Sequence, residues 1–197
     1  MLRVVRPSGW LVLLTIAGCG GGSKSAAVPS GPPPVQVIQV SALTDLYLLE
    51  LNGAPPLDTA FALKPGVART VIVRHAPPDN NTFAELQFPV SVFGTDSTAD
   101  SVHLSVKARP GVYGLTLESD RPLGPGARIT FKYPVHFQAP QAATGRYGNA
   151  LAFERALMVG VEQEDGRFGL LASTRPASDN LSAPMPRAGT YLAAAPR

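Results

Sequence analysis

The amino-acid sequence predicts an all-β domain built as an antiparallel β-sandwich. Residues 35–197 contain short runs in which apolar residues alternate or are β-branched, a pattern typical of half-buried strands. Clusters of Pro, Gly, Asp and Asn separate these runs at the spacing of a sandwich. No repeat with a period of roughly 20 to 50 residues is present, which argues against a solenoid or a propeller. The length suits one hydrophobic core, so we expect a single domain over 35–197.

Alternating runs predict the strands in the first half of this domain. The run Val71-Ile72-Val73 is apolar on both faces, which predicts a central strand. Pro89 interrupts a later run, which predicts an edge strand, a bend or two strands there. The clearest alternation begins at Val102, and it points His103 away from the core. The predicted strands of this half cover 35–40, 46–51, 67–75, 85–93 and 102–107.

The second half continues the same pattern. Arg109-Pro110-Gly111 predicts a turn that leads into a strand at 113–117, and a further strand is expected at 129–133. Residues 149–161 fit both a helix and a strand. We favour the strand because Glu164-Asp165-Gly166-Arg167 is a strong hairpin signal. That hairpin would join 157–162 to 168–171.

Several segments near the end of the chain carry a resemblance to a known class of domains. They are Ala127–Tyr133, Asp165–Thr174, Asp179–Ser182 and Gly189–Tyr191. Together they are similar to the end of ZU5-like and Ig-like bacterial surface domains, although Phe168 stands where Trp is commoner. The resemblance implies an Ig-like form of the sandwich. It also implies a structural or binding role, because such domains mostly act as modules of that kind.

The first eighteen residues have the layout of a secretory signal. Arg3 and Arg6 precede an apolar run from Trp10 to Gly18, which is too short to span a bilayer as a helix. The residues Ile16-Ala17-Gly18-Cys19 resemble a lipobox, the signal of bacterial lipoproteins. That resemblance implies cleavage before Cys19 and attachment of a lipid to its sulfur.

The only cysteine of the chain supports this interpretation. Cys19 has no partner for an intramolecular disulfide, and a multiply acylated cysteine anchors a protein stably to a membrane. Residues 19–34 are rich in Gly, Ser and Pro, which predicts a tether between the lipid and the domain. Gly20 stands where Asp would retain a lipoprotein in the inner membrane of enteric bacteria. We therefore expect a bacterial cell-envelope protein on the outer membrane, facing the periplasm.

Charge and motifs exclude several functions. Removal of the signal takes two arginines with it, so the formal net charge falls from +3 to +1. This balance does not favour nucleic-acid binding. The sequence has no G-x-S-x-G or S-x-x-K motif for a nucleophilic serine. We therefore assign no catalytic residue, no metal ligand and no cofactor, and lipid attachment at Cys19 is the one predicted site.

The leading hypothesis is a membrane-anchored, non-enzymatic binding or structural module. The alternative is a metal-binding envelope protein that uses His75, His103 and His136, because imidazoles from different strands can converge on zinc. Against it, each histidine fits an ordinary strand position, and we see no acidic residue at a telling spacing. A further alternative is an accessory subunit of an envelope assembly, which would require a protein partner.

Overall fold

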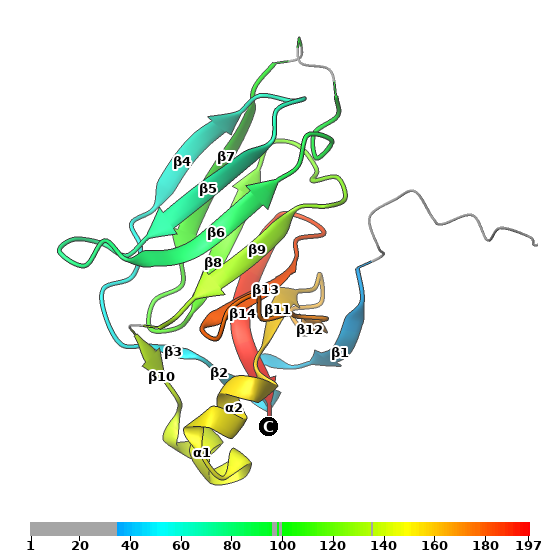
Figure 1. The fold of residues 1–197 in the computed structure, drawn as a ribbon. Helices are drawn as coiled ribbons and strands as arrows, with labels where there is room; N and C mark the ends of the chain where they lie inside the picture. Colours follow the sequence, from blue (N-terminus) through cyan, green and yellow to red (C-terminus); the bar gives the residue numbers. More distant parts are fainter. Residues whose placement is uncertain (1–34, 96–97, 99, 135) are drawn as a thin grey trace, which may run out of the picture. The chain divides into compact units, whose positions relative to one another are not determined.

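The computed structural model describes residues 35–95, 98, 100–134 and 136–197, which form an antiparallel β-sandwich (Figure 1). The fold class predicted from the sequence is thus confirmed. The larger sheet has eight strands. In spatial order they are β1 (Val37–Ser41), β12 (Phe168–Leu171), β11 (Met158–Glu162), β14 (Gly189–Pro196), β8 (Gly114–Ser119), β7 (Val102–Ala108) and β4 (Thr59–Leu63), with β2 (Leu46–Leu48) paired to β14.

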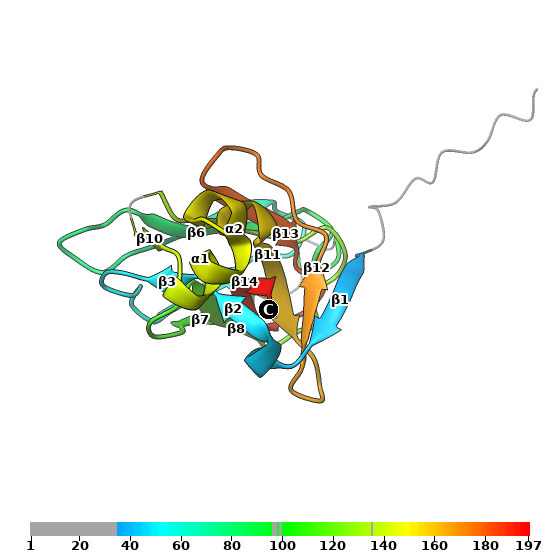
Figure 2. The same ribbon diagram turned by 90° about the horizontal axis from the view of Figure 1, so that it is seen from below.

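The smaller sheet has four strands and covers one face of the larger one. Its order is β13 (Asn180–Pro184), β9 (Arg128–Lys132), β6 (Thr82–Phe88) and β5 (Arg69–Arg74). The strands β10 (Phe137–Gln138) and β3 (Glu50–Leu51) pair with each other as a short antiparallel ribbon. Three short helices complete the fold, namely η1 (Leu43–Asp45), α1 (Gln141–Tyr147) and α2 (Ala150–Ala156). Figures 1 and 2 show α1 and α2 at one end of the sandwich, near the end of β14.

Aromatic side chains bridge the two sheets in the core. Phe83 of β6 stacks on Tyr113, which directly precedes β8, with 5.2 Å between the ring centroids. Phe131 of β9 meets Phe83 edge-on at 5.7 Å. All three rings are fully buried, and such contacts add to the free energy of burial because they follow the preferred geometries of aromatic pairs. This cluster fixes the position of Tyr113 beside the end of β5.

Two sequence expectations about local structure are confirmed. In β7 the residues Val102, Leu104 and Val106 are buried, whereas His103 is exposed. The hairpin between β11 and β12 turns at Gly166, whose φ of 77° suits glycine. Alternation and turn chemistry therefore predict these elements correctly.

The prediction that residues 71–73 form a central strand is wrong. Val71-Ile72-Val73 lies in β5, which is the edge of the smaller sheet and pairs only with β6. Ile72 points to the outside with 48 % of its surface exposed, while Val73 faces the core. An apolar residue on the outer face is therefore no proof of a covered strand. Pro89 directly follows β6 and ends it, although β6 itself is internal and not an edge.

The strand favoured for 149–161 is also wrong in its first half, where α2 forms. The side chain of Asn149 accepts a hydrogen bond from the backbone N–H of Ala152 at 2.8 Å and so caps the helix. The helix ends at Leu157, where the backbone becomes extended and leads into β11. The helix α1 and the strands β4 and β13 were not expected from the sequence.

The predicted signal, the lipobox with Cys19 and most of the tether lie outside the described residues. Among the residues that are described, no helix combines the length and the apolar character needed to cross a membrane.

Candidate metal centre

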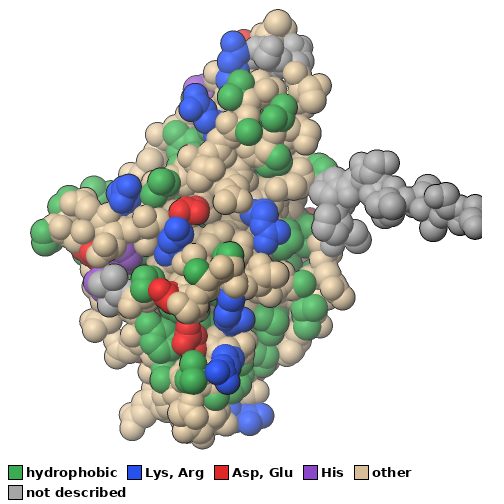
Figure 3. Space-filling view, in the orientation of Figure 1, with side chains coloured by type: hydrophobic (Ala, Val, Ile, Leu, Met, Phe, Trp, Pro, Cys, Tyr) green, Lys and Arg blue, Asp and Glu red, His purple; other side chains and the backbone are tan. Residues whose placement is uncertain are grey.

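Three chemically suited side chains converge at one flank of the sandwich. His75 directly follows β5, Asp79 lies in the loop between β5 and β6, and His136 lies between β9 and β10. One ligand atom of each lies within 4.8 Å of the other two. Within the described part of the chain, this is the one group of three His, Cys, Asp or Glu side chains that meets so closely. Figure 3 shows histidine side chains reaching the surface at the lobe formed by the β5–β6 loop.

His75 is held rigidly by its surroundings. It is only 2 % exposed, and its ring meets that of Phe83 edge-on at 5.3 Å between centroids. Its Nδ1 lies 2.9 Å from the backbone carbonyl oxygen of Ala54. Because a carbonyl only accepts, Nδ1 must carry the proton in this contact. The lone pair of the neutral ring is then on Nε2, which is the arrangement of a histidine prepared to bind a metal.

His136 is placed by a glycine and by a carboxylate. Its Nε2 contacts Oδ2 of Asp79, and its ring centroid lies 4.6 Å from that of His75. The ring also rests on Gly53, where a Cβ atom would be 2.9 Å from Nδ1 of His136. Gly53 has a φ of 154°, a backbone angle that residues other than glycine rarely adopt. The absence of a side chain at Gly53 therefore leaves space for the ring of His136.

Asp79 is oriented by its own loop. The Asn81 backbone N–H and the Asn81 side-chain amide both contact Oδ1 of Asp79, which leaves Oδ2 for His136. The hydrogen bond with His136 lowers the pKa of Asp79, against a smaller opposing effect of burial. Asp79 and His136 have 17 % and 18 % of their side-chain surfaces exposed. An ion can thus reach the group from solvent.

A cavity of about 110 Å³ adjoins the group. Tyr113 lines it, and the buried hydroxyl of Tyr113 has no hydrogen-bond partner among the described residues. Burial, and then the negative charge of Asp79, raise the pKa of Tyr113 well above its usual value. The hydroxyl therefore remains a neutral donor and acceptor. The full lining is His75, Asn81, Thr82, Tyr113, Lys132, Pro134 and His136.

Among the described residues that line this cavity, Lys132 is the one lysine or arginine. Its Nζ lies 2.5 Å from Oε1 of Glu85 on the neighbouring strand, so its charge is already balanced. Among the described acidic groups, Asp79 therefore contributes a negative charge beside the cavity that no lysine or arginine balances.

Two imidazoles and one carboxylate suit a divalent transition metal. Zinc is bound at about 2.0–2.2 Å by such ligands, often by three of them with a fourth position left open. Tetrahedral geometry would place the ligand atoms about 3.4 Å apart, so small side-chain movements would close the group around an ion. Mg²⁺ and Ca²⁺ prefer all-oxygen sites and fit less well.

The structure only partly agrees with the three-histidine alternative. It brings His75 and His136 together, but His103 is not in the group. His103 lies on the exposed side of β7, and its backbone N–H donates to Oδ2 of Asp120 at 3.1 Å. The expectation of no suitable acidic partner is wrong, because Asp79 fills that place. Its signal in the sequence is the four-residue step from His75 to Asp79 across a Pro-rich and Asn-rich turn.

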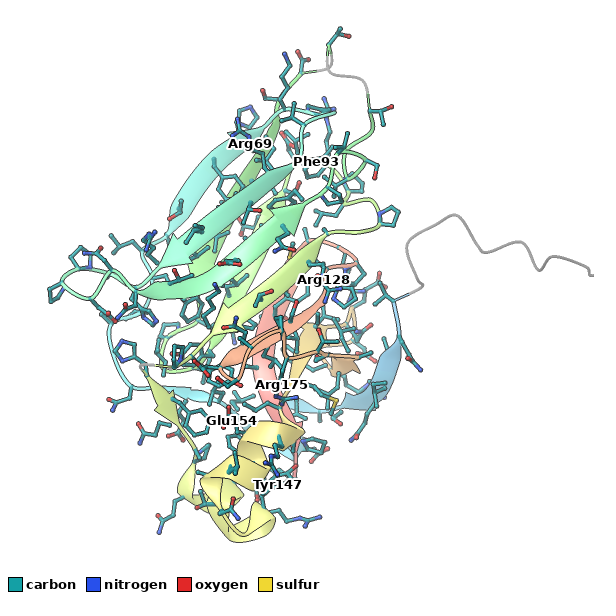
Figure 4. The ribbon with its side chains drawn as sticks, viewed as in Figure 1. Arg69, Phe93, Arg128, Tyr147, Glu154 and Arg175 are labelled. Carbon is teal, nitrogen blue, oxygen red and sulfur yellow. The ribbon has the colours of Figure 1, made fainter. Side chains whose placement is uncertain are left out.

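A second polar cluster has a structural role. Nη2 of Arg175 donates to the backbone carbonyl oxygens of Glu154 and Leu157 at 2.6 and 2.9 Å. The hydroxyl of Tyr133 donates to Oε1 of Glu154 at 3.2 Å. Figure 4 shows Glu154 and Arg175 close to each other at the α2 end of the sandwich. The arginine thus holds two carbonyls at the C-terminal end of α2, of which that of Glu154 also accepts the backbone N–H of Leu157. Arginine contacts of this kind stabilise the end of a helix, so the cluster anchors α2.

The side-chain geometry is the basis for assigning the centre, because no protein-family model, curated protein or solved structure matches this chain.

Proposed function

We propose that this chain is a lipid-anchored, non-enzymatic envelope protein whose domain binds one divalent transition metal ion, with zinc as the best fit. The observation that supports the proposal is the convergence of His75 and Asp79, from the connection between β5 and β6, with His136, from the connection between β9 and β10. The binding module expected from the sequence thereby acquires a specific ligand.

The surroundings of the group favour metal binding over a plain hydrogen-bonded cluster. The Ala54 carbonyl selects the tautomer of His75 that exposes Nε2. The Asn81 contacts hold one oxygen of Asp79 and leave the other at the group. Gly53 leaves space for the ring of His136. Each ligand thus has its own supporting contact, and such contacts commonly raise metal affinity about 10- to 100-fold.

The test is metal binding by the full chain, purified in detergent through a tag without histidine. Elemental analysis and calorimetry should find one zinc ion per chain. Replacing a ligand in the variants H75A, D79N and H136A should weaken binding by more than about 100-fold, since even a supporting contact is worth 10- to 100-fold.

The matched control is H103A, which removes an exposed histidine outside the group and should leave affinity unchanged. A wild-type chain that binds no metal would overturn the proposal, and so would an equal loss of affinity in H103A and H75A.

The membrane anchor is a separate part of the proposal and is supported by the Ile16-Ala17-Gly18-Cys19 sequence alone. Lipid on Cys19 would hold the domain on the outer membrane, on the order of 20 Å from the bilayer through the tether. The variant C19S should keep its signal and lose its membrane association. A C19S protein that is still processed and sediments with membranes would contradict the anchor without affecting the metal site.

A further inference from the structure

We infer that a metal ion bound by His75, Asp79 and His136 keeps one coordination position open toward the adjoining cavity, and that this position binds a small monovalent anion together with the hydroxyl of Tyr113. This inference rests on the proposed metal site and adds a ligand class to it.

The number and charge of the protein ligands support an anion. Three protein ligands leave a tetrahedral ion with one free position. Two neutral imidazoles and one carboxylate reduce the charge of a divalent ion to +1 at the site. A monovalent anion would neutralise this charge, whereas a divalent anion would leave an excess negative charge in a half-buried place. Buried charges without a partner are unfavourable.

The cavity supplies the space, and Tyr113 lies in its lining. Its volume of about 110 Å³ compares with about 30 Å³ for a water molecule in the liquid, so a guest of a few heavy atoms fits. The buried Tyr113 hydroxyl finds no partner within the described residues. An unsatisfied buried hydroxyl destabilises a fold by about 1–3 kcal/mol. A guest that accepts its hydrogen bond would remove this penalty.

The neighbouring lysine bears on which anions the site should prefer. Lys132 lines the same cavity, but its ammonium group is already paired with Glu85 at 2.5 Å. Among the described residues of the lining, no further lysine or arginine would balance a dianion. We therefore expect azide and acetate to bind and the dianion sulfate to bind much more weakly.

The experiment uses the full chain loaded with Co²⁺, whose visible absorption reports the ligands of the ion. Titration with azide or acetate should change the spectrum with saturation at one anion per metal. Sulfate at the same concentration should change it little. The variant Y113F should bind azide about tenfold more weakly, the effect of one hydrogen bond to a charged group, while its affinity for Co²⁺ stays the same.

The matched control is Y147F. Tyr147 lies in α1, where its hydroxyl donates to the backbone oxygen of Pro196, so its loss should not alter azide binding. Y113F should also unfold at the same temperature as the metal-free wild type or above it, because it removes an unsatisfied hydroxyl. A lower unfolding temperature would contradict the assignment of that hydroxyl.

The outcomes separate the two proposals. If Co²⁺ binds but azide and acetate leave the spectrum unchanged, the anion site is wrong and the metal site stands. The anion site is also wrong if Y113F binds azide as tightly as the wild type. If calorimetry finds no metal bound to the wild-type chain, both proposals fall.

Discussion

In the described part of the chain, a histidine contacts an aspartate at two places, which differ in the atoms that are in contact. At the β5–β6 flank, the His136 imidazole contacts the Asp79 carboxylate, and His75 joins them. On the open face of β7 and β8, Asp120 instead accepts a hydrogen bond from the backbone N–H of His103. The imidazole of His103 is left exposed to solvent.

The difference shows what makes a binding group out of common residues. At the flank, two connections, β5–β6 and β9–β10, bring three side chains with metal-binding atoms to one point beside a cavity. On the open face, the carboxylate is used to satisfy the backbone at the beginning of a strand, and nearby charges pair across the two strands. Residue type alone does not distinguish the two places, whereas the direction of the side chains does.

The largest expected effect is stabilisation of the wild-type chain by zinc. Free zinc at about 100 times its dissociation constant would add about 2.7 kcal/mol to the free energy of unfolding. For a domain of this size that corresponds to a rise in melting temperature of roughly 5 to 10 °C. Calorimetry should find this rise in H103A and not in D79N. If H103A loses this rise in melting temperature, or if D79N keeps it, the proposed difference between the two histidine–aspartate places is wrong.

A smaller effect is expected from G53A, which tests how the flank is shaped. The new Cβ would lie 2.9 Å from Nδ1 of His136, at a backbone φ of 154°. The strain should lower the free energy of unfolding by about 1–3 kcal/mol. The displaced ring should weaken zinc binding by at least about tenfold.

The control for this effect is G166A, in the hairpin between β11 and β12. Its φ is 77° and its Cβ would meet no atom within 4 Å. G166A should therefore lose stability and keep its zinc affinity. Equal zinc affinities in G53A and G166A would show that Gly53 does not place His136.

The smallest effect concerns the open face and is a stabilisation that is lost in acid. Hydrogen bonds from Lys107 and then from Ser105 lower the pKa of Glu118 below its ordinary value of 4.5. Glu118 therefore stabilises the fold fully above pH 4.5, and this contribution is lost as the pH falls through the lower value of the folded state. The difference in unfolding free energy between wild type and E118Q should shrink between pH 7 and pH 3. A difference that stays constant over this range would contradict the assignment.

Local patterns in the sequence predict the elements whose structure depends on neighbours in the chain. The alternation from Val102 to Val106 predicts β7 and its exposed side, and the turn at Gly166 predicts the hairpin. Local patterns do not predict the position of a strand where that position depends on contacts with residues far away in the sequence. The run 71–73 is equally compatible with a central and an edge strand, and only the pairing of whole sheets decides between them.

The candidate site depends even more on distant contacts. His75 and His136 are 61 positions apart in the sequence, and their meeting depends on how β5, β9 and β10 are arranged. Asp79 has a local signal in its spacing from His75, but four residues across a turn do not by themselves indicate that the two side chains meet. The predicted lipid attachment at Cys19 lies outside the described residues and stays a prediction.

The position of β14 has a consequence for how the domain is made. This strand consists of residues 189–196, yet it lies inside the larger sheet, where it pairs with β11, β8 and β2. A chain that emerges with its N-terminus first presents β2 and β8 long before their shared neighbour appears. The larger sheet can close only after Gly189–Pro196 has emerged. Until then β8, β11 and β2 lack the strand that pairs with all three, and the chain remains incompletely folded.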